Sequence, residues 1–221
     1  MKKALIGLSK DLILGIMAGM CISIGCVAFL SSGDKVVGSL FFVVGLFMIL
    51  NLDFNLFTGK VCYAFDNKPF YILRLVFIWI GNFLGALVSA LLIGATRLKG
   101  LKEACEGIVN TKLNDSLISL FVLAIFCNVL IFLAVYGYKN FDNIIAKTLA
   151  LVFGVSVFVL CGFEHCVADM FYFCFAWVWT GRMLLSLLII TLGNIVGGLF
   201  IPLVIKLNKK MDNTTQNEEK K

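Results

Sequence analysis

The sequence predicts an all-α membrane protein with six transmembrane helices arranged as an inverted 3+3 repeat, in which the second and fifth helices are broken. Three observations predict this fold class. The 221-residue chain is 61% hydrophobic and only 14% charged, whereas soluble domains are about 45–50% apolar. Several apolar stretches are long enough to cross a bilayer, and a Gly-Asn motif occurs in two of them. This composition excludes a disordered chain, a disulfide-rich secreted scaffold and an ordinary soluble enzyme.

The predicted spans follow from length, because a helix needs about 20 apolar residues to cross about 30 Å of hydrocarbon. The stretches that qualify are Leu12–Leu30, Val36–Phe57, Phe70–Thr96, Ser116–Tyr138, Leu149–Trp179 and Met183–Ile205. The first follows three lysines and could be a secretory signal. Its length and the absence of an A-x-A cleavage site favour a first span instead.

The lysines and arginines predict the orientation. An even number of spans places both termini on one side, and thirteen of the 19 basic residues lie in the termini and the loops on that side. By the positive-inside rule, both termini are cytoplasmic and the protein is a multi-pass protein of the cell membrane. We therefore expect a cytoplasmic N-terminus over residues 1–11, one transmembrane domain over 12–206 and a disordered cytoplasmic tail over 207–221. The net charge of +6 is spread over short loops, so no nucleic-acid partner is expected.

An internal repeat predicts the inverted arrangement. The segment Gly81–Leu87 (GNFLGAL) in the third span returns as Gly193–Leu199 (GNIVGGL) in the sixth, 112 positions later. Each half, about 12–96 and 116–205, then holds three spans, and an odd number forces the halves into opposite orientations. Inverted repeats are typical of channels and transporters, whose pathway lies at the repeat interface. The glycines of the two motifs are explained by close helix packing.

The middle span of each half contains a polar interruption. Residues 149–179 would form a helix of about 46 Å, too long for a single crossing, and Glu164, His165 and Asp169 lie at its centre. The matching span of the first half is interrupted at Asn51–Asn55. Non-helical backbone at membrane depth occurs only where it is buried in protein or lines a cavity. Two such breaks at equivalent places predict the functional site.

His165 is the only histidine of the chain. It is either a buried structural residue or a polar point in a permeation path, and its place at a helix break favours the second interpretation. A metal site is not expected, because one histidine with nearby Glu164, Asp169 and Cys166 does not provide a zinc geometry. The eight cysteines lie mostly in apolar runs and form no CxxC pair. We interpret them as small buried apolar residues, and no cofactor is expected.

Two segments resemble one family. Gly162–Phe171 (GFEHCVADMF) closely resembles the G-F-E-H-S-x-A-N-M signature of formate/nitrite transporters, and Asp53-x-x-Leu56-Phe57-Thr58-Gly59 resembles the loop that interrupts that family's second helix. The resemblance extends over all six spans. It implies an aquaporin-like protomer, assembled as a homopentamer with one pore in each protomer. It also implies conduction of small monovalent weak-acid anions such as formate, nitrite or hydrosulfide.

The resemblance also implies roles for individual residues. Thr58 matches the loop threonine of the family, His165 the pore histidine, and Glu164 the acid of the signature. Asn128 and Asn194 match asparagines that face the pore. The positions that match the apolar constrictions are Phe42, Leu46, Leu56, Phe57 and Phe158.

The sequence departs from the family pattern at two positions. Asp169 replaces the asparagine four residues after the histidine, on the same face of the helix as His165. An ionised Asp169 touching His165 would favour imidazolium and would also repel an anion. Asp169 is therefore protonated, or points to a neighbouring helix, or changes how the substrate is handled. Cys166 replaces the family's serine, which hints at hydrosulfide.

The function that we predict is a channel for formate, with protonation at the central histidine, and nitrite or hydrosulfide as alternatives. A bare anion in an apolar constriction loses several kcal/mol of hydration free energy, whereas the neutral acid does not. We expect vestibule lysines to attract the anion, with Lys10 and Lys147 on the inside and Lys112 on the outside. His165 and Thr58 would then hydrogen-bond the anion, and the neutral acid would cross.

Two other classes of protein fit the sequence less well. An aquaporin-type channel for neutral solutes shares the inverted repeat, but the sequence has no Asn-Pro-Ala pair at either break. A membrane enzyme would need a nucleophile, metal or cofactor motif, and no GxSxG, HExxH or nucleotide-binding GxGxxG motif occurs. The sequence therefore predicts no enzymatic activity.

Overall fold

The computed structural model describes the backbone of residues 2–219 and the side chains of residues 4–212, and this part of the chain is helical without any strand. The predicted all-α class is therefore confirmed. The helices are α1 (Lys2–Ser32), α2 (Lys35–Asn51), α3 (Phe57–Val61), α4 (Phe70–Gly94), α5 (Lys102–Asn114), α6 (Leu117–Asn140), α7 (Ile144–Cys161), α8 (Cys166–Ala176) and α9 (Gly181–Glu219). Short 3₁₀ turns lie at Ala64–Asp66 and Arg97–Leu101.

Within the described residues, five helices are long and apolar enough to cross a membrane: α1, α4, α6, α7 and α9. The chain is therefore a membrane protein. The helices α2 and α8 are also apolar but shorter, and each lies beside one of the two polar interruptions. The total of six crossings stays a prediction.

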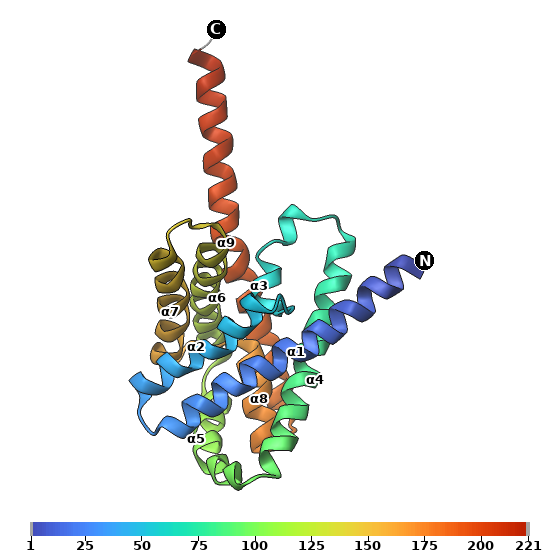
Figure 1. Cartoon of the computed structure of the whole chain (residues 1–221), viewed down its shortest axis with the longest axis vertical. Coiled ribbons are helices and arrows are strands. Elements are labelled where there is room, and N and C mark those ends of the chain that lie inside the picture. Colours follow the sequence, from blue (N-terminus) through green and yellow to red (C-terminus); the bar gives the residue numbers. More distant parts are fainter. Residues whose placement is uncertain (1, 220–221) are drawn as a thin grey trace.

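The two halves of the chain repeat one packing pattern. In the first half, α1 packs against α2 and α4, and in the second half α6 packs against α7 and α9. The halves join where α2 contacts α7 and where α4 contacts α8. Helix α5 lies at one end of the molecule, and the last part of α9 projects from the opposite end (Figure 1).

The repeated glycines lie where the two helices of each pair approach most closely. A Cβ atom on Gly81 would be 2.5 Å from the carbonyl oxygen of Leu12, and one on Gly193 would be 2.5 Å from that of Phe121. Four residues later, a Cβ on Gly85 or Gly197 would overlap a carbonyl oxygen of the same partner helix. The two motifs thus make equivalent contacts, α4 on α1 and α9 on α6, as expected for small residues between membrane helices.

Residues 2–11, predicted as the cytoplasmic N-terminus, form the beginning of α1. Two other segments differ from what the sequence suggested. Residues 97–114, expected as a loop, form a 3₁₀ turn and the polar helix α5. Helix α9 continues to Glu219, whereas we expected a disordered tail from residue 207. This end of the chain has no proline after Pro202 and is rich in helix-compatible residues. Residues 1, 220 and 221 of the predicted terminal segments lie outside the described residues.

The glycine contacts yield a stability test. We expect Gly85→Ala and Gly197→Ala each to destabilise the detergent-solubilised protein by about 1–3 kcal/mol, because an added methyl group overlaps backbone of the partner helix. Thermal unfolding followed by size-exclusion chromatography measures the change. Gly94→Ala is the matched control, since a Cβ at Gly94 meets nothing within 4 Å. Equal melting temperatures for all three variants and the wild type would contradict this packing.

Candidate functional site

The two interruptions have the same backbone geometry. Helix α2 ends before Asp53, which has a φ of 52°, and α7 ends before Gly162, which has a φ of 72°. In both cases the next residue, Phe54 or Phe163, donates its backbone N–H to the carbonyl oxygen five residues earlier, at 3.0 and 2.9 Å. The left-handed conformation closes the helix, and the chain then turns toward a second short helix. His165 in the second break occupies the position that Leu56 holds in the first.

In the first break, the side chain of Asn82 on α4 binds the backbone that would otherwise lack partners. Asn82 is fully buried. Its Oδ1 accepts from the N–H of Phe57, the first residue of α3, at 2.9 Å. Its Nδ2 donates to the carbonyl oxygens of Asn55 and Gly15, at 2.9 and 2.8 Å. One amide thus fixes the start of α3 to α4 and α1.

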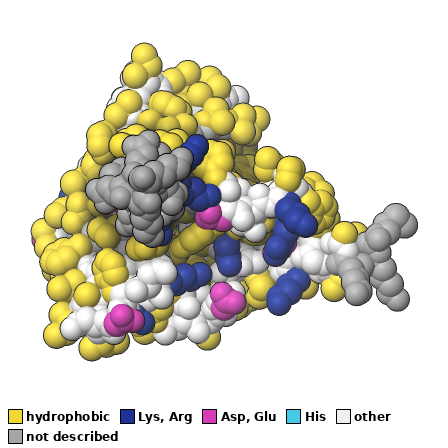
Figure 2. Space-filling model, turned by 90° about the horizontal axis from the view of Figure 1, so that it is seen from above, with side chains coloured by type: hydrophobic (Ala, Val, Ile, Leu, Met, Phe, Trp, Pro, Cys, Tyr) yellow, Lys and Arg dark blue, Asp and Glu magenta, His cyan; other side chains and the backbone are white. Residues whose placement is uncertain are grey.

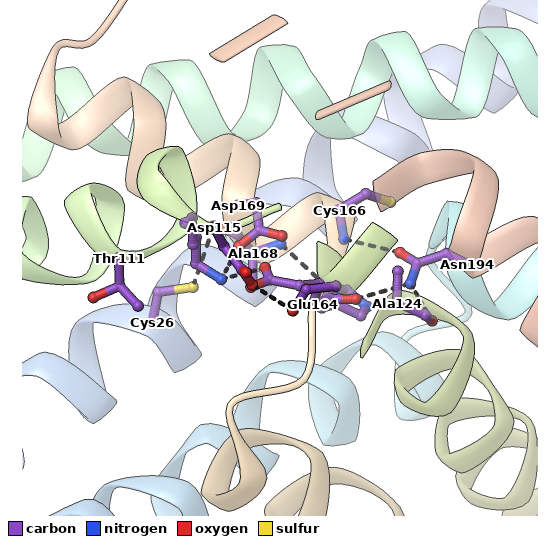
Figure 3. A network of polar contacts seen from close by, with 12 residues as sticks. Cys26, Thr111, Asp115, Ala124, Glu164, Cys166, Ala168, Asp169 and Asn194 are labelled. Carbon is purple, nitrogen blue, oxygen red and sulfur yellow. Dashed lines mark hydrogen bonds and ion pairs between the residues drawn. The ribbon is translucent and has the colours of Figure 1, made fainter. Parts of the chain in front are cut away.

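Asn194 on α9 makes the same three bonds in the second half. Its Oδ1 accepts from the N–H of Cys166, the first residue of α8, at 2.9 Å. Its Nδ2 donates to the carbonyl oxygens of Glu164 (2.9 Å) and Ala124 (2.8 Å). Figure 3 shows Asn194 between these residues. The repeated Gly-Asn motifs therefore carry both the helix packing and the support of the two breaks.

His165 and Thr58 meet where the two breaks come together. The hydroxyl oxygen of Thr58 lies 2.9 Å from Nε2 of His165, and both residues are buried. The other ring nitrogen, Nδ1, accepts from the backbone N–H of Ala168 at 3.2 Å, so His165 caps α8. Because Nδ1 is an acceptor, the ring is neutral, with its proton on Nε2, and Nε2–H donates to Thr58. The positive end of α8 also favours a neutral ring.

Two cavities flank this contact. The first, about 430 Å³ and here called the terminal pocket, is lined by the end of α2, the first break, α3, and parts of α1, α4 and α6. Its basic side chains are Lys60, Lys139 and Arg74. Figure 2 looks down on the end of the molecule from which α9 projects: Lys, Arg and a few acidic side chains lie among other polar atoms, with hydrophobic side chains around them. The second, about 250 Å³ and here called the α5 pocket, is lined by Lys112, Glu164, His165 and Asp169, among others.

Apolar side chains lie around the His165–Thr58 contact, both in the terminal pocket and in the α5 pocket, which His165 itself lines. Leu46 and Leu56 line the terminal pocket and are almost fully buried. Phe42 and Phe158 line the α5 pocket. The two phenyl rings meet edge to face with centroids 5.7 Å apart, and Phe158 stacks on the imidazole at 5.5 Å. The one polar contact thus has buried apolar side chains on the side of each pocket.

Lys112 binds two carboxylates in the α5 pocket. Its Nζ contacts Glu164 Oε2 closely and lies 2.9 Å from Asp169 Oδ1. Burial alone would lower the pKa of Lys112, but Asp169 and Glu164 outweigh burial and raise it above the ordinary lysine value. Lys112 is therefore a permanent cation. Asp169 thus contacts the neighbouring helix α5, which is one of the three alternatives that its replacement of asparagine left open.

An ion pair also supports the first break, on the other side of the molecule. Arg74 on α4 donates to the buried Asp11 on α1 through Nε (2.6 Å) and Nη2 (2.9 Å). Asp11 Oδ1 also accepts from Nδ2 of Asn55 at 3.0 Å. Asn55 and Glu164 hold equivalent places in the two breaks. Each break is therefore tied to a neighbouring helix by a charged contact.

Several residues that the sequence singled out lie elsewhere. Phe57 lines neither flanking pocket but a third, apolar cavity between α3, α4 and α9. Asn128 donates to the backbone carbonyl oxygens of Thr58 (3.2 Å) and Asn194 (2.6 Å). Its side-chain amide therefore holds the backbone of the site. Lys10 and Lys147 line neither flanking pocket. Lys10 lies on α1 and Lys147 on α7, and the sequence alone did not predict which way these side chains face.

Three residues of the site were not predicted from the sequence. Lys60 and Lys139 are, with Arg74, the basic side chains of the terminal pocket, and Asn82 supports the first break. The signal for Asn82 was present, because the repeat pairs it with Asn194. No signal in the sequence distinguished Lys60 and Lys139 from other loop lysines. Within the described residues, no group of three or more His, Cys, Asp or Glu side chains could hold a metal ion.

Comparison with known proteins gives a consistent result. The model of the formate/nitrite transporter family matches residues 1–207. The chain is 28% identical to the uncharacterized transporter YrhG of Bacillus subtilis, over 92% of this chain and 86% of the relative. It is 30% identical to a probable formate transporter of Methanothermobacter thermautotrophicus, over 86% of this chain and 85% of the relative.

A solved structure shares the fold. A pentameric formate channel with formate bound superposes with a TM-score of 0.75, covering 94% of this chain and 98% of that chain, at 24% identity. At this identity the likeness concerns the arrangement of the helices.

The asparagine contacts yield a second test. We expect Asn82→Asp and Asn194→Asp each to destabilise the protein by about 1–3 kcal/mol, because the carboxylate keeps the acceptor but leaves two buried carbonyl oxygens without a donor. Thermal unfolding in detergent measures the loss. Asn110→Asp on the exposed face of α5 is the control. Wild-type stability in both variants would show that the amides do not hold the breaks.

Proposed function

The chain belongs to the formate/nitrite transporter family, and from that premise we propose that it conducts small weak-acid anions across the cell membrane, with formate as its main substrate. It is a channel or transporter and not an enzyme. The observation that carries the proposal is the His165–Thr58 contact, placed between two cavities and enclosed by apolar side chains. Two relatives with similar sequence or fold are described as a probable formate transporter and a formate channel, which supports formate.

The geometry suggests how an anion is held. Since Nε2–H of His165 donates to the Thr58 oxygen, the hydroxyl proton of Thr58 is available, and no acceptor for it occurs among the described residues. An anion that reaches this point can accept from Thr58 and, by displacing the existing bond, from His165. Two such donors replace part of the hydration that the anion loses on entering the site.

Protonation beside the central histidine then allows transit. The side chains on either route are apolar: Leu46 and Leu56 toward the terminal pocket, and Phe42 and Phe158 toward the α5 pocket. Moving formate through them as an ion would cost several kcal/mol of hydration free energy. Formic acid has no net charge and avoids most of this cost. We therefore propose that the neutral acid is the species that crosses.

The orientation and assembly belong to the same proposal. The bias of lysine and arginine supports a cytoplasmic position for both termini, with the terminal pocket open to the inside and the α5 pocket open to the outside. The solved structure with the same fold is described as pentameric. We propose a homopentamer in which each protomer contains its own pathway.

Substitution of the histidine tests the substrate contact. For His165→Asn and His165→Phe, we expect formate uptake into proteoliposomes at pH 7 to fall about tenfold or more, since a hydrogen bond to a charged group contributes about 1.5–3 kcal/mol. Uptake at pH 5 should fall less, because more substrate is already neutral. Size-exclusion chromatography checks that the assembly is intact. If both variants kept the wild-type rate and pH profile, His165 would be a structural residue.

The same flux assay with nitrite, acetate and hydrosulfide identifies the preferred substrate.

The basic side chains of the terminal pocket give a separate test. The pocket is also lined by Asp11, Asp53 and Asp66, of which Asp11 is paired with Arg74 and Asp66 with Lys206. We expect the double variant Lys60→Gln/Lys139→Gln to slow formate flux from this side about tenfold at low ionic strength, because it removes the positive charge that exceeds the remaining carboxylate and attracts an anion. The difference should shrink in high salt. Lys10→Gln/Lys147→Gln removes the same charge outside the pocket and should change the flux much less. A larger effect of this second pair would restore the vestibule predicted from the sequence.

A further inference from the structure

The second carboxylate at Lys112 is a feature that the proposed function does not use. Lys112 contacts Glu164 and Asp169 together, and all three side chains line the α5 pocket beside His165. We propose that Asp169 carries a proton at rest and is the acid that protonates an anion entering from the α5 side. This inference rests on the proposed function and adds the source of the proton.

The charge balance supports a protonated Asp169. One ammonium group and two ionised carboxylates would leave a net negative charge among side chains that are at least nine-tenths buried. An uncompensated buried charge costs several kcal/mol, and two carboxylates that share a site do not both ionise freely. One bound proton makes the cluster neutral.

The contacts indicate which carboxylate holds the proton. Glu164 contacts Lys112 through Oε2, and neither of its carboxylate oxygens is buried without a hydrogen-bond partner among the described residues. Asp169 contacts Lys112 through Oδ1 only, and its Oδ2 is buried without a hydrogen-bond partner among the described residues. A charged oxygen without a donor is more costly than a neutral hydroxyl in the same place. The proton is therefore assigned to Oδ2 of Asp169.

The other groups around Asp169 do not change this balance. Three titratable side chains are close enough to the carboxyl group to interact with it electrostatically: Cys26 on α1, Cys127 on α6 and Tyr172 on α8. They are neutral at physiological pH, as is the His165 ring whose Nδ1 accepts from Ala168. Figure 3 shows Asp169 and Glu164 together, with Cys26 and Cys166 nearby. Lys35 also lines the pocket but is exposed, and no ion pair connects it to Asp169 in the described part of the chain.

The proton transfer can be written with its charges balanced. An anion enters the α5 pocket, where Lys112 attracts it. The O–H bond of Asp169 breaks, its electron pair stays on the aspartate oxygen, and a new O–H bond forms on the formate oxygen. Formic acid moves on past Phe42 and Phe158, and the cluster is left with one negative charge. Water at the mouth of the α5 pocket then returns a proton to Asp169, so one proton accompanies each anion.

His165 is a less suitable source of this proton. To carry a second proton, the ring would have to give up the bond from Ala168 at Nδ1 and accept positive charge at the N-terminus of α8. Asp169 loses no such bond when it is protonated. His165 therefore positions the anion, while Asp169 supplies the proton.

Infrared spectroscopy tests the resting state without depending on transport. In the purified wild-type protein at pH 7, we expect the carbonyl band of a protonated carboxylic acid. The band should shift when the aspartate carboxyls are labelled with carbon-13, and it should be missing in Asp169→Asn. Asparagine occupies this place in the signature that Gly162–Phe171 resembles, so the variant is expected to fold. Asp142→Asn, in the exposed loop before α7, is the matched control and should keep the band.

Flux measurements test the transfer step. With the anion supplied from the α5 side at pH 7, Asp169→Asn should lower formate uptake about 100-fold, within the usual range for loss of a general acid. At pH 5 the loss should be smaller, and Asp142→Asn should match the wild type. The inference would be overturned if the wild-type protein showed no acid band at pH 7, or if the band did not shift when the aspartate carboxyls carry carbon-13. A wild-type flux in Asp169→Asn would also overturn it. If the wild type takes up no formate at any pH, the proposed function fails, while the infrared band still reports on Asp169.

Discussion

A helix that stops inside a bilayer leaves backbone N–H and C=O groups that no water can reach, and satisfying them is the constraint on which this structure depends. The chain meets it with two asparagines. Asn82 and Asn194 each accept from the first N–H of a short helix and donate to two carbonyl oxygens, at almost identical distances. The repeated glycines bring the supporting helices close enough for these amides to reach the breaks. The His165–Thr58 contact exists because both breaks are held in this way.

The two halves are alike in backbone but differ in charge. At the first break, Asn55 bonds to Asp11, which Arg74 neutralises. At the second, Glu164 and Asp169 together face the single cation Lys112. The first cluster is balanced without a proton, whereas the second requires one. The two halves therefore share their backbone contacts but differ in the charge beside each break, which suits the proposed binding of an anion and release of a neutral acid.

The sequence predicted the features that depend on local pattern. Apolar length predicted the five helices that are long enough to cross a membrane. The polar residues at 51–55 and 164–169 lie where α2 and α7 end and the next short helices begin, and the Gly-Asn repeat predicted the equivalent packing of the two halves. Features that depend on distant packing were not predictable. Phe57 was predicted in the constriction from a family position, and Lys147 in a vestibule from its charge. The direction of each side chain, however, is set by the packing of neighbouring helices. The pairing of Asp169 with Lys112 required α5, a polar segment whose apolar periodicity is weak and which we expected to be a loop.

The most direct test of the central claim is the dependence of formate flux on membrane potential. Proteoliposomes with a fixed potassium diffusion potential and an internal pH indicator report flux and proton entry together. If the neutral acid crosses the apolar constriction, the flux is independent of the potential, and one proton enters with each formate. A flux that follows the potential and leaves the internal pH unchanged would show that the bare anion crosses, contradicting the mechanism proposed for His165 and its apolar surroundings.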